Sequence, residues 1–234
     1  MSIENLAAAI IAEPKALSPQ GAITWHPEVW DARMGSSPEC LAALEQVKTA
    51  SRVRDGVYCI DREGVRTVAA GGDPLRTFVA SQVWGYGDRG YGAFRVSKVL
   101  GLTGDVPPAR FAQVLTKLAA AQRQCRERGG VEAYRYLVND GKTASLGTAF
   151  LTKYLYFIPS PAEPTPLVLD AVVRRAIERH SREALRQSFG RTQYYEDYLK
   201  LVSDVVESLA SEHDVRCKLD DVEAALFRIG KVRS

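Results

Sequence analysis

The chain has few cysteines and histidines and no long run of apolar residues. Its four cysteines, Cys40, Cys59, Cys125 and Cys217, stand far apart, without a C-x-x-C pair or a histidine at ligand spacing. This pattern argues against a structural zinc site and an iron–sulfur cluster. No stretch approaches the roughly 18 apolar residues of a membrane span, and the first residues lack the features of a secretory signal. We therefore expect a cytoplasmic protein with no membrane segment, no metal and no cofactor.

The chain also has little net charge, because 31 Lys and Arg are nearly balanced by 28 Asp and Glu, giving +3. This balance permits a nucleic-acid partner without requiring one. Basic residues gather at 123–128, 174–182 and 186–191, whereas acids concentrate after residue 196, so one face is expected to be basic and another acidic. Hydrophobic residues make up 46% of the 234 residues, enough to bury a core, which excludes disorder as the main state.

From Asp73 onward the pattern is helical. Asp73 is a typical N-cap residue and Pro74 suits the first helical position. Apolar spacing and helix breakers then predict further helices over 93–100, about 107–128, 131–138, 148–158, 170–182, 192–211 and 220–229. We expect residues 73–234 to form one helical domain, so the predicted fold class is mainly α.

Residues 1–72 are less regular. A short amphipathic helix is predicted over 1–12, and a second helix is expected to open near 41–44. A small hairpin is predicted to pair 56–60 with 65–69 across the turn 61–64. We expect this N-terminal segment to pack on the helical domain.

The most informative feature is a lysine in a small-residue and aromatic stretch, followed 17 residues later by an aspartate at a predicted helix start. A free lysine has a pKa near ~10.4, so a nucleophilic lysine must be desolvated or placed beside other cations. Apolar and aromatic residues surround Lys153 in the sequence, and Asp170 is placed to be held and kept ionised as an N-cap. The pair indicates a lysine nucleophile and a carboxylate that face one cleft.

This constellation resembles the helix-hairpin-helix DNA glycosylase superfamily and, within it, the 8-oxoguanine DNA glycosylase-like branch. Residues 169–175, Leu-Asp-Ala-Val-Val-Arg-Arg, are similar to the family's aspartate motif, and Lys153 matches the hairpin lysine. The resemblance covers about 73–229, with motif-level specificity only over 147–175. It implies a helix-hairpin-helix glycosylase-type domain in which Lys153 attacks C1′ of a flipped nucleotide and Asp170 assists.

The DNA contacts implied by the resemblance begin at the hairpin, where the backbone of Gly147, Thr148 and Ala149 would lie on a phosphate. Aligned on Lys153, however, the two hairpin glycines of the family fall at Ala149 and Leu151. No cluster of four cysteines follows the aspartate, which disfavours an iron–sulfur member of the superfamily. Basic residues directly after the aspartate favour further phosphate contacts, by Arg174 and Arg175.

A glycine-rich stretch, Trp84 to Gly92, is predicted to be a loop that approaches the base closely. Its glycines alternate with aromatic and charged residues that could stack on a base or read it. The residues predicted to recognise the base are Trp84, Tyr86, Asp88, Arg89 and Phe150. A tight helix connection with Trp84 in the core is the alternative for this stretch.

The function implied is removal of a modified base from double-stranded DNA, with or without strand cleavage at the abasic site, and with no obligatory protein partner. The family implies oxidised guanine as the base, but the unusual hairpin and the glycine-rich stretch leave room for a different lesion or for a bulky modified base of viral DNA, in antiviral defence. Two further readings stay open. One is a DNA-binding module without turnover, and the other is a protein-interaction domain that uses Tyr194 to Tyr198 and the last helix.

Overall fold

The computed structural model describes residues 3–13, 15–88, 90–104, 109–181 and 189–231. Within these ranges the chain forms twelve helices and three short strands, so the predicted mainly α fold is confirmed. The helices are α1 (Ile3–Ala12), α2 (Pro27–Met34), α3 (Pro38–Ala50), α4 (Arg62–Ala70), α5 (Pro74–Tyr86), α6 (Gly90–Leu100), α7 (Ala109–Arg128), α8 (Gly130–Val138), α9 (Thr148–Tyr156), α10 (Ala171–His180), α11 (Thr192–His213) and α12 (Leu219–Lys231). The strands are β1 (Ile23–Trp25), β2 (Arg52–Arg54) and β3 (Val57–Ile60).

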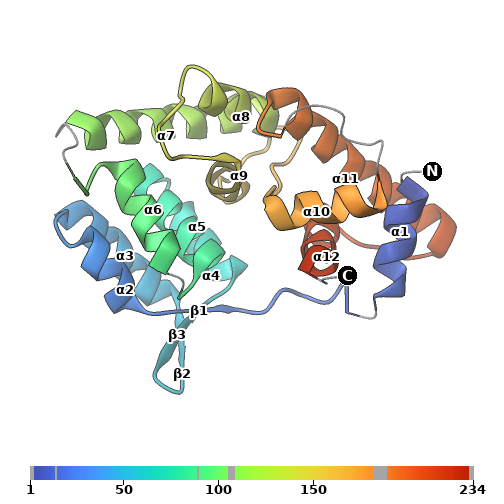
Figure 1. Ribbon diagram of the computed structural model, residues 1–234, viewed down its shortest axis with the longest axis horizontal. Helices are drawn as coiled ribbons and strands as arrows, with labels where there is room; N and C mark the ends of the chain where they lie inside the picture. Colours follow the sequence, from blue (N-terminus) through green and yellow to red (C-terminus); the bar gives the residue numbers. More distant parts are fainter. Residues whose placement is uncertain (1–2, 14, 89, 105–108, 182–188, 232–234) are drawn as a thin grey trace.

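Two groups of helices stand on either side of α9 (Figure 1). The first group contains α2 to α6, and the second contains α1 with α10, α11 and α12. Helices α7 and α8 run along one edge between the groups, and α9 packs on α5, α7 and α8. The first helix of the chain therefore belongs with the last three. The division at residues 72 and 73 stays a prediction.

The predicted glycine-rich loop is wrong, because α5 continues through Gly85 to Tyr86 and α6 already begins at Gly90. Two of the glycines serve close packing. A Cβ at Gly85 would lie 2.4 Å from Cδ of Lys153, and one at Gly92 would lie 2.4 Å from Cβ of Tyr86. Asp73, by contrast, caps α5 as predicted, since its side chain accepts a hydrogen bond from the backbone N–H of Arg76 (2.9 Å).

The predicted hairpin is also wrong. Strands β2 and β3 pair across Asp55 and Gly56, which have φ of 51° and 77°, as a two-residue Asp-Gly turn requires. The expected second strand is instead helix α4. Asp61 caps this helix by accepting a hydrogen bond from the backbone N–H of Gly64 (2.9 Å). Residues 61–64 therefore form the capped start of a helix and not a turn between two strands. Strand β1 completes a three-stranded antiparallel sheet in the order β1-β3-β2.

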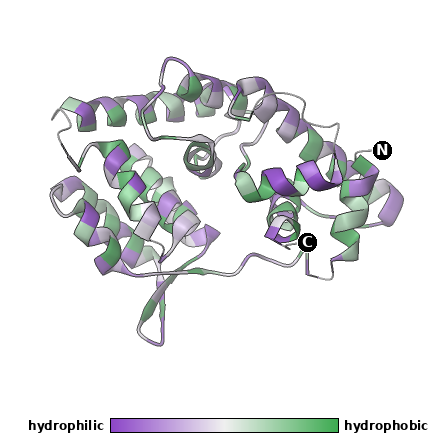
Figure 2. Cartoon of the chain, in the orientation of Figure 1, coloured by the Kyte–Doolittle hydropathy of each residue, from purple (hydrophilic) through white to green (hydrophobic). Residues whose placement is uncertain are grey.

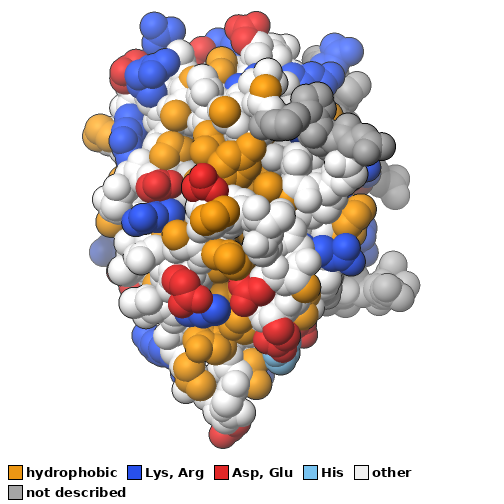
Figure 3. Space-filling model, turned by 90° about the vertical axis from the view of Figure 1, so that its left-hand side faces the viewer, with side chains coloured by type: hydrophobic (Ala, Val, Ile, Leu, Met, Phe, Trp, Pro, Cys, Tyr) orange, Lys and Arg blue, Asp and Glu red, His pale blue; other side chains and the backbone are white. Residues whose placement is uncertain are grey.

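Buried apolar side chains form one core cluster that draws on both helix groups and on α9. Most helices carry both hydrophilic and hydrophobic residues (Figure 2), as helices with one buried side do. None of the described helices is long and apolar enough to cross a membrane. The side of the molecule with α2, α3 and α6 carries acidic, basic and apolar side chains intermingled (Figure 3). The predicted separation of basic and acidic faces does not hold on this side.

Candidate active site between the helix groups

The connection between α8 and α9 takes the place of the predicted hairpin. Ser145 in this connection has φ of 70°, in the left-handed region. Three backbone carbonyl oxygens of the connection accept hydrogen bonds from cationic side chains of α6 and α7. Arg95 donates to Ser145 (2.8 Å), Arg110 to Ala144 (2.9 Å) and Lys117 to Lys142 (2.7 Å). Side chains from neighbouring helices therefore hold this connection, which lacks the family's glycine pattern.

The start of α9 is open at its N-cap. Gly147 has extended backbone, and no described atom lies within 4 Å of where its Cβ would be. Thr148 is buried, with its hydroxyl 3.1 Å from that of Tyr134, and Ala149 is half-buried. The first N–H groups of a helix have no partner within that helix, and they carry a partial positive charge. The structure thus places all three predicted phosphate-contacting residues at a helix end suited to an anion.

An extended segment, residues 167–169, leads into α10 and is held by hydrogen bonds on two sides. Thr152 Oγ1 accepts from the N–H of Leu169 (3.0 Å) and donates to its carbonyl oxygen (3.1 Å). Two tyrosines of α11 hold the other side of the segment. The Tyr195 hydroxyl accepts from the N–H of Leu167 and donates to its carbonyl oxygen, and the Tyr198 hydroxyl donates to the carbonyl oxygen of Val168. The tyrosines considered for a protein interface, Tyr194, Tyr195 and Tyr198, are buried, and the last two position this segment.

Lys153 and Asp170 meet directly beyond these bonds. Lys153 Nζ lies 3.3 Å from Oδ2 of Asp170, and the two side chains are only 6% and 14% exposed. Asp170 is the N-cap of α10, and its Oδ1 accepts from the backbone N–H groups of Val172 (2.8 Å) and Val173 (3.1 Å). One carboxylate oxygen is therefore held by the backbone, and the other faces the amine.

Aromatic rings form the wall on the other side of the lysine. Its Nζ lies 5.3 Å from the ring centre of Tyr86, which stacks on Phe150 at 4.6 Å. Burial raises the pKa of Tyr86, and the nearby carboxylate of Asp170 raises it further, so this tyrosine is neutral at physiological pH. The stem of Lys153 passes Gly85, where any side chain would collide with it.

The remaining predicted residues are more dispersed. Trp84 is buried and its ring contacts those of Tyr156 and Phe157, whereas Asp88 is exposed on the turn after α5. Arg89 lies outside the described residues. On α10, the guanidinium of Arg174 is 3.3 Å from Glu178 and lies over the ring of Phe189, while Arg175 is exposed.

A buried ion pair beside the site was missed by the sequence analysis. Glu223 of α12 is 2% exposed and pairs with Arg62, the first residue of α4. The same guanidinium donates to the hydroxyl of Tyr156 (2.6 Å) and lies over the rings of Trp84 and Tyr156. These contacts tie the two helix groups together behind Lys153.

The only signal for this pair in the sequence is an acid on the apolar side of a helix, since Glu223 is three residues before the buried Leu226. Its partner is 161 residues away, so no local spacing could have indicated it. Burial raises the pKa of Glu223, and Arg62 opposes that rise.

A helical fold in which a buried lysine contacts an N-capping aspartate is the arrangement expected of a helix-hairpin-helix glycosylase. Consistent with this class, a family model described as "Putative 8-oxoguanine DNA glycosylase OGG-like protein" matches residues 17–227. Because the match covers most of the chain, the protein belongs to this OGG-like family. No curated protein and no solved structure matches the chain.

Proposed function

We propose that the protein is a DNA glycosylase in which Lys153 is the nucleophile and Asp170 its acid/base and electrostatic partner. The observation that carries this proposal is the contact of 3.3 Å between Nζ of Lys153 and Oδ2 of Asp170, whose side chains are both nearly buried. Membership of the OGG-like family supports the same reaction class. A buried amine beside a fixed carboxylate can lose its proton to that carboxylate when substrate binds.

The reaction would proceed by covalent catalysis. The neutral amine of Lys153 attacks C1′, the bond between C1′ and the base nitrogen breaks, and the base leaves with that electron pair and takes up a proton. Opening of the sugar ring gives an imine between Lys153 and C1′. Hydrolysis of the imine leaves an abasic site, whereas β-elimination from it cleaves the strand on the 3′ side. Asp170 passes the proton that it received from Lys153 to the departing base. Its carboxylate, held by two backbone N–H groups, is then charged again and stabilises positive charge on the sugar.

The DNA backbone would bind beside this site. The N–H groups at Gly147, Thr148 and Ala149 suit a phosphate, and the exposed Arg175, with Arg174, can extend this contact along α10. Among the residues predicted to recognise the base, Tyr86 contacts Lys153 and stacks on Phe150, so these two rings would wall the sugar and base.

The proposed substrate is DNA that carries oxidised guanine, as the family description suggests. A second candidate is a larger modified base, such as those of viral DNA, and antiviral defence would then be the role. A cavity of about 760 Å³ next to Tyr156 has room for such a base, because that volume is in the range of pockets for drug-sized ligands.

The test is to trap the imine. Duplexes with 8-oxoguanine, with unmodified guanine and with a glucosylated cytosine are incubated with the protein and borohydride, which reduces an imine to a stable protein–DNA adduct. We expect an adduct with one modified duplex, and its loss in Lys153→Gln. Lys200→Gln is the matched control, since Lys200 is 74% exposed on α11 and should leave adduct formation unchanged.

Released base without an adduct would remove Lys153 from the nucleophile role and favour a water molecule activated by Asp170. Neither base release nor adduct on any duplex, together with salt-dependent binding, would favour the DNA-binding module without turnover. No DNA binding at all would overturn both readings.

A further inference from the structure

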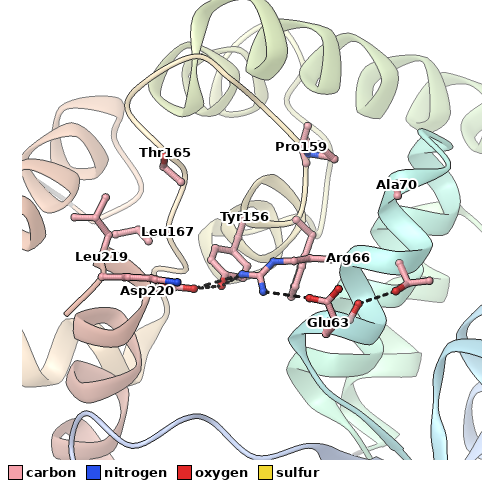
Figure 4. A pocket seen from close by; sticks show the side chains of 13 residues that line it. Glu63, Arg66, Ala70, Tyr156, Pro159, Thr165, Leu167, Leu219 and Asp220 are labelled. Atoms are coloured by element: carbon pink, nitrogen blue, oxygen red, sulfur yellow. Dashed lines mark hydrogen bonds and ion pairs between the residues drawn. The ribbon is translucent and has the colours of Figure 1, made fainter. Parts of the chain in front are cut away.

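The cavity next to Tyr156 lies between α4, α9 and α12 and is separate from the start of α9. Figure 4 shows Arg66 and Glu63 on its α4 side, Leu219 and Asp220 on its α12 side, and Tyr156 between them. Apolar side chains make up much of its wall, among them Phe157, Leu167 and Leu219. We call it the α4–α9–α12 cavity.

This cavity is one helical turn from the proposed nucleophile. Tyr156 follows Lys153 by three residues, so the two side chains leave neighbouring positions of α9, about 4.5 Å apart along the axis. A nucleotide with its C1′ at Lys153 would therefore have its base within reach of Tyr156. Tyr156 also lines the cavity, so the base would reach the cavity at this residue.

A donor and an acceptor stand side by side in the cavity. Nη2 of Arg66 and Oδ2 of Asp220 are 3.4 Å apart, and the two side chains are 46% and 30% exposed. The hydroxyl of Tyr156 bonds both, because it accepts from Arg66 (2.9 Å) and donates to Asp220 (3.1 Å). The pair is thus matched to a group that combines an acceptor with a donor.

We propose that Arg66 and Asp220 read the edge of the flipped base, and that this base has a carbonyl oxygen beside an N–H group, as guanine and 8-oxoguanine do. Arg66 donates to the carbonyl oxygen and Asp220 accepts from the N–H group. The Tyr156 hydroxyl also accepts from Arg66 and donates to Asp220. The base edge therefore takes over both of these hydrogen bonds from the hydroxyl. This inference rests on the proposed function.

Replacement of the hydroxyl also makes binding selective for the base. The Tyr156 hydroxyl is a shared partner of Arg62, Arg66 and Asp220. A base with the matching edge can compensate for the lost bonds, whereas a base without it leaves Arg66 and Asp220 unpaired. An unpaired polar group costs more than the bond it had made, which is the source of the selectivity.

The experiment measures binding of the nucleoside 8-oxo-2′-deoxyguanosine to the full chain by ligand-observed NMR, without any cleavage step. Asp220→Asn and Arg66→Met are expected to raise its dissociation constant at least tenfold. Tyr156→Phe is expected to lower it, because the competing hydroxyl is gone. O6-methyl-2′-deoxyguanosine, which lacks both the carbonyl and the N1–H, should bind more weakly to the parent.

Asp204→Asn is the matched control, since Asp204 is a 29% exposed aspartate paired with Lys200 on α11, and it should bind the nucleoside as the parent does. Tighter binding by Tyr156→Phe could not come from damage to the fold. Lack of binding by the parent, or equal binding by parent, Asp220→Asn and Arg66→Met, would overturn the inference. Nucleoside binding as expected without imine trapping would leave the cavity assignment standing and reject the chemistry of Lys153.

Discussion

At the scale of single residues, the position of Lys153 depends on a glycine in another helix. Gly85 is inside α5, where an alanine would ordinarily be preferred by as much as ~1 kcal/mol. Its missing side chain leaves room for the lysine stem, with Cδ and Cε only 2.4 and 2.6 Å from a hypothetical Cβ. The glycine therefore serves the site and not the helix.

Gly85→Ala is expected to displace the Lys153 amine and to reduce imine trapping at least tenfold. The free energy of unfolding should change little, because the lysine end can move and alanine favours the helix. Urea unfolding and borohydride trapping measure the two effects. Gly90→Ala, in α6 with no described atom within 4 Å of the new Cβ, should retain full trapping. Full trapping by Gly85→Ala would contradict this role.

At the scale of elements, α10 and the segment before it position the carboxylate. Thr152 and two tyrosines hold residues 167–169, and Asp170 then caps the helix with one oxygen while the other meets Lys153. The two uses of Asp170 can be separated, because an asparagine keeps an oxygen for the cap but loses the charge.

In a Lys153→Met background, which removes the buried amine, Asp170→Ala should lower the free energy of unfolding about 0.5–2 kcal/mol more than Asp170→Asn does. With Lys153 present, both substitutions should abolish most imine trapping, because neither supplies a carboxylate. Urea unfolding of the four variants and the parent provides the comparison. Equal stability of the alanine and asparagine variants would show that the cap contributes nothing.

At the scale of the whole molecule, Arg62 and Glu223 connect the two helix groups behind the site. Burial raises the pKa of Glu223 and Asp170 adds to the rise, while Arg62 and Lys153 oppose it. The folded protein therefore holds this proton more tightly than the unfolded chain does. The resulting stabilisation is present below the ordinary pKa of 4.5 and is lost as the pH rises through the folded pKa.

Glu223→Gln removes this titration. Relative to the variant, the parent should lose stability as the pH rises above 4.5, by at most ~1.4 kcal/mol per pH unit for one proton. Urea unfolding of both proteins from pH 4 to 7 gives the difference. A difference that is constant with pH, or one that grows in favour of the parent, would contradict the raised pKa.

The local signals in the sequence were sufficient for most helices after residue 73 and for the contact between Lys153 and Asp170. Capping residues such as Asp73 and Asp170, together with apolar spacing, depend on neighbours within one or two turns, so they can be recognised without the fold. The glycines between Trp84 and Gly92 misled for the opposite reason. Gly85 and Gly92 make room for side chains across a helix contact, and a glycine that serves packing looks the same in sequence as one that ends a helix.

The sequence by itself therefore determined a mainly α fold and the proximity of a lysine and an aspartate that are 17 residues apart. Only the tertiary structure decided that Arg62 meets Glu223, that Arg66 and Asp220 share the Tyr156 hydroxyl, and that a cavity lies beside them. These partners come from α4, α9 and α12, and their contacts form when the two helix groups pack together. Such contacts follow from the packing of whole helices. The spacing of residues along the chain predicts each helix but not which helices pack together.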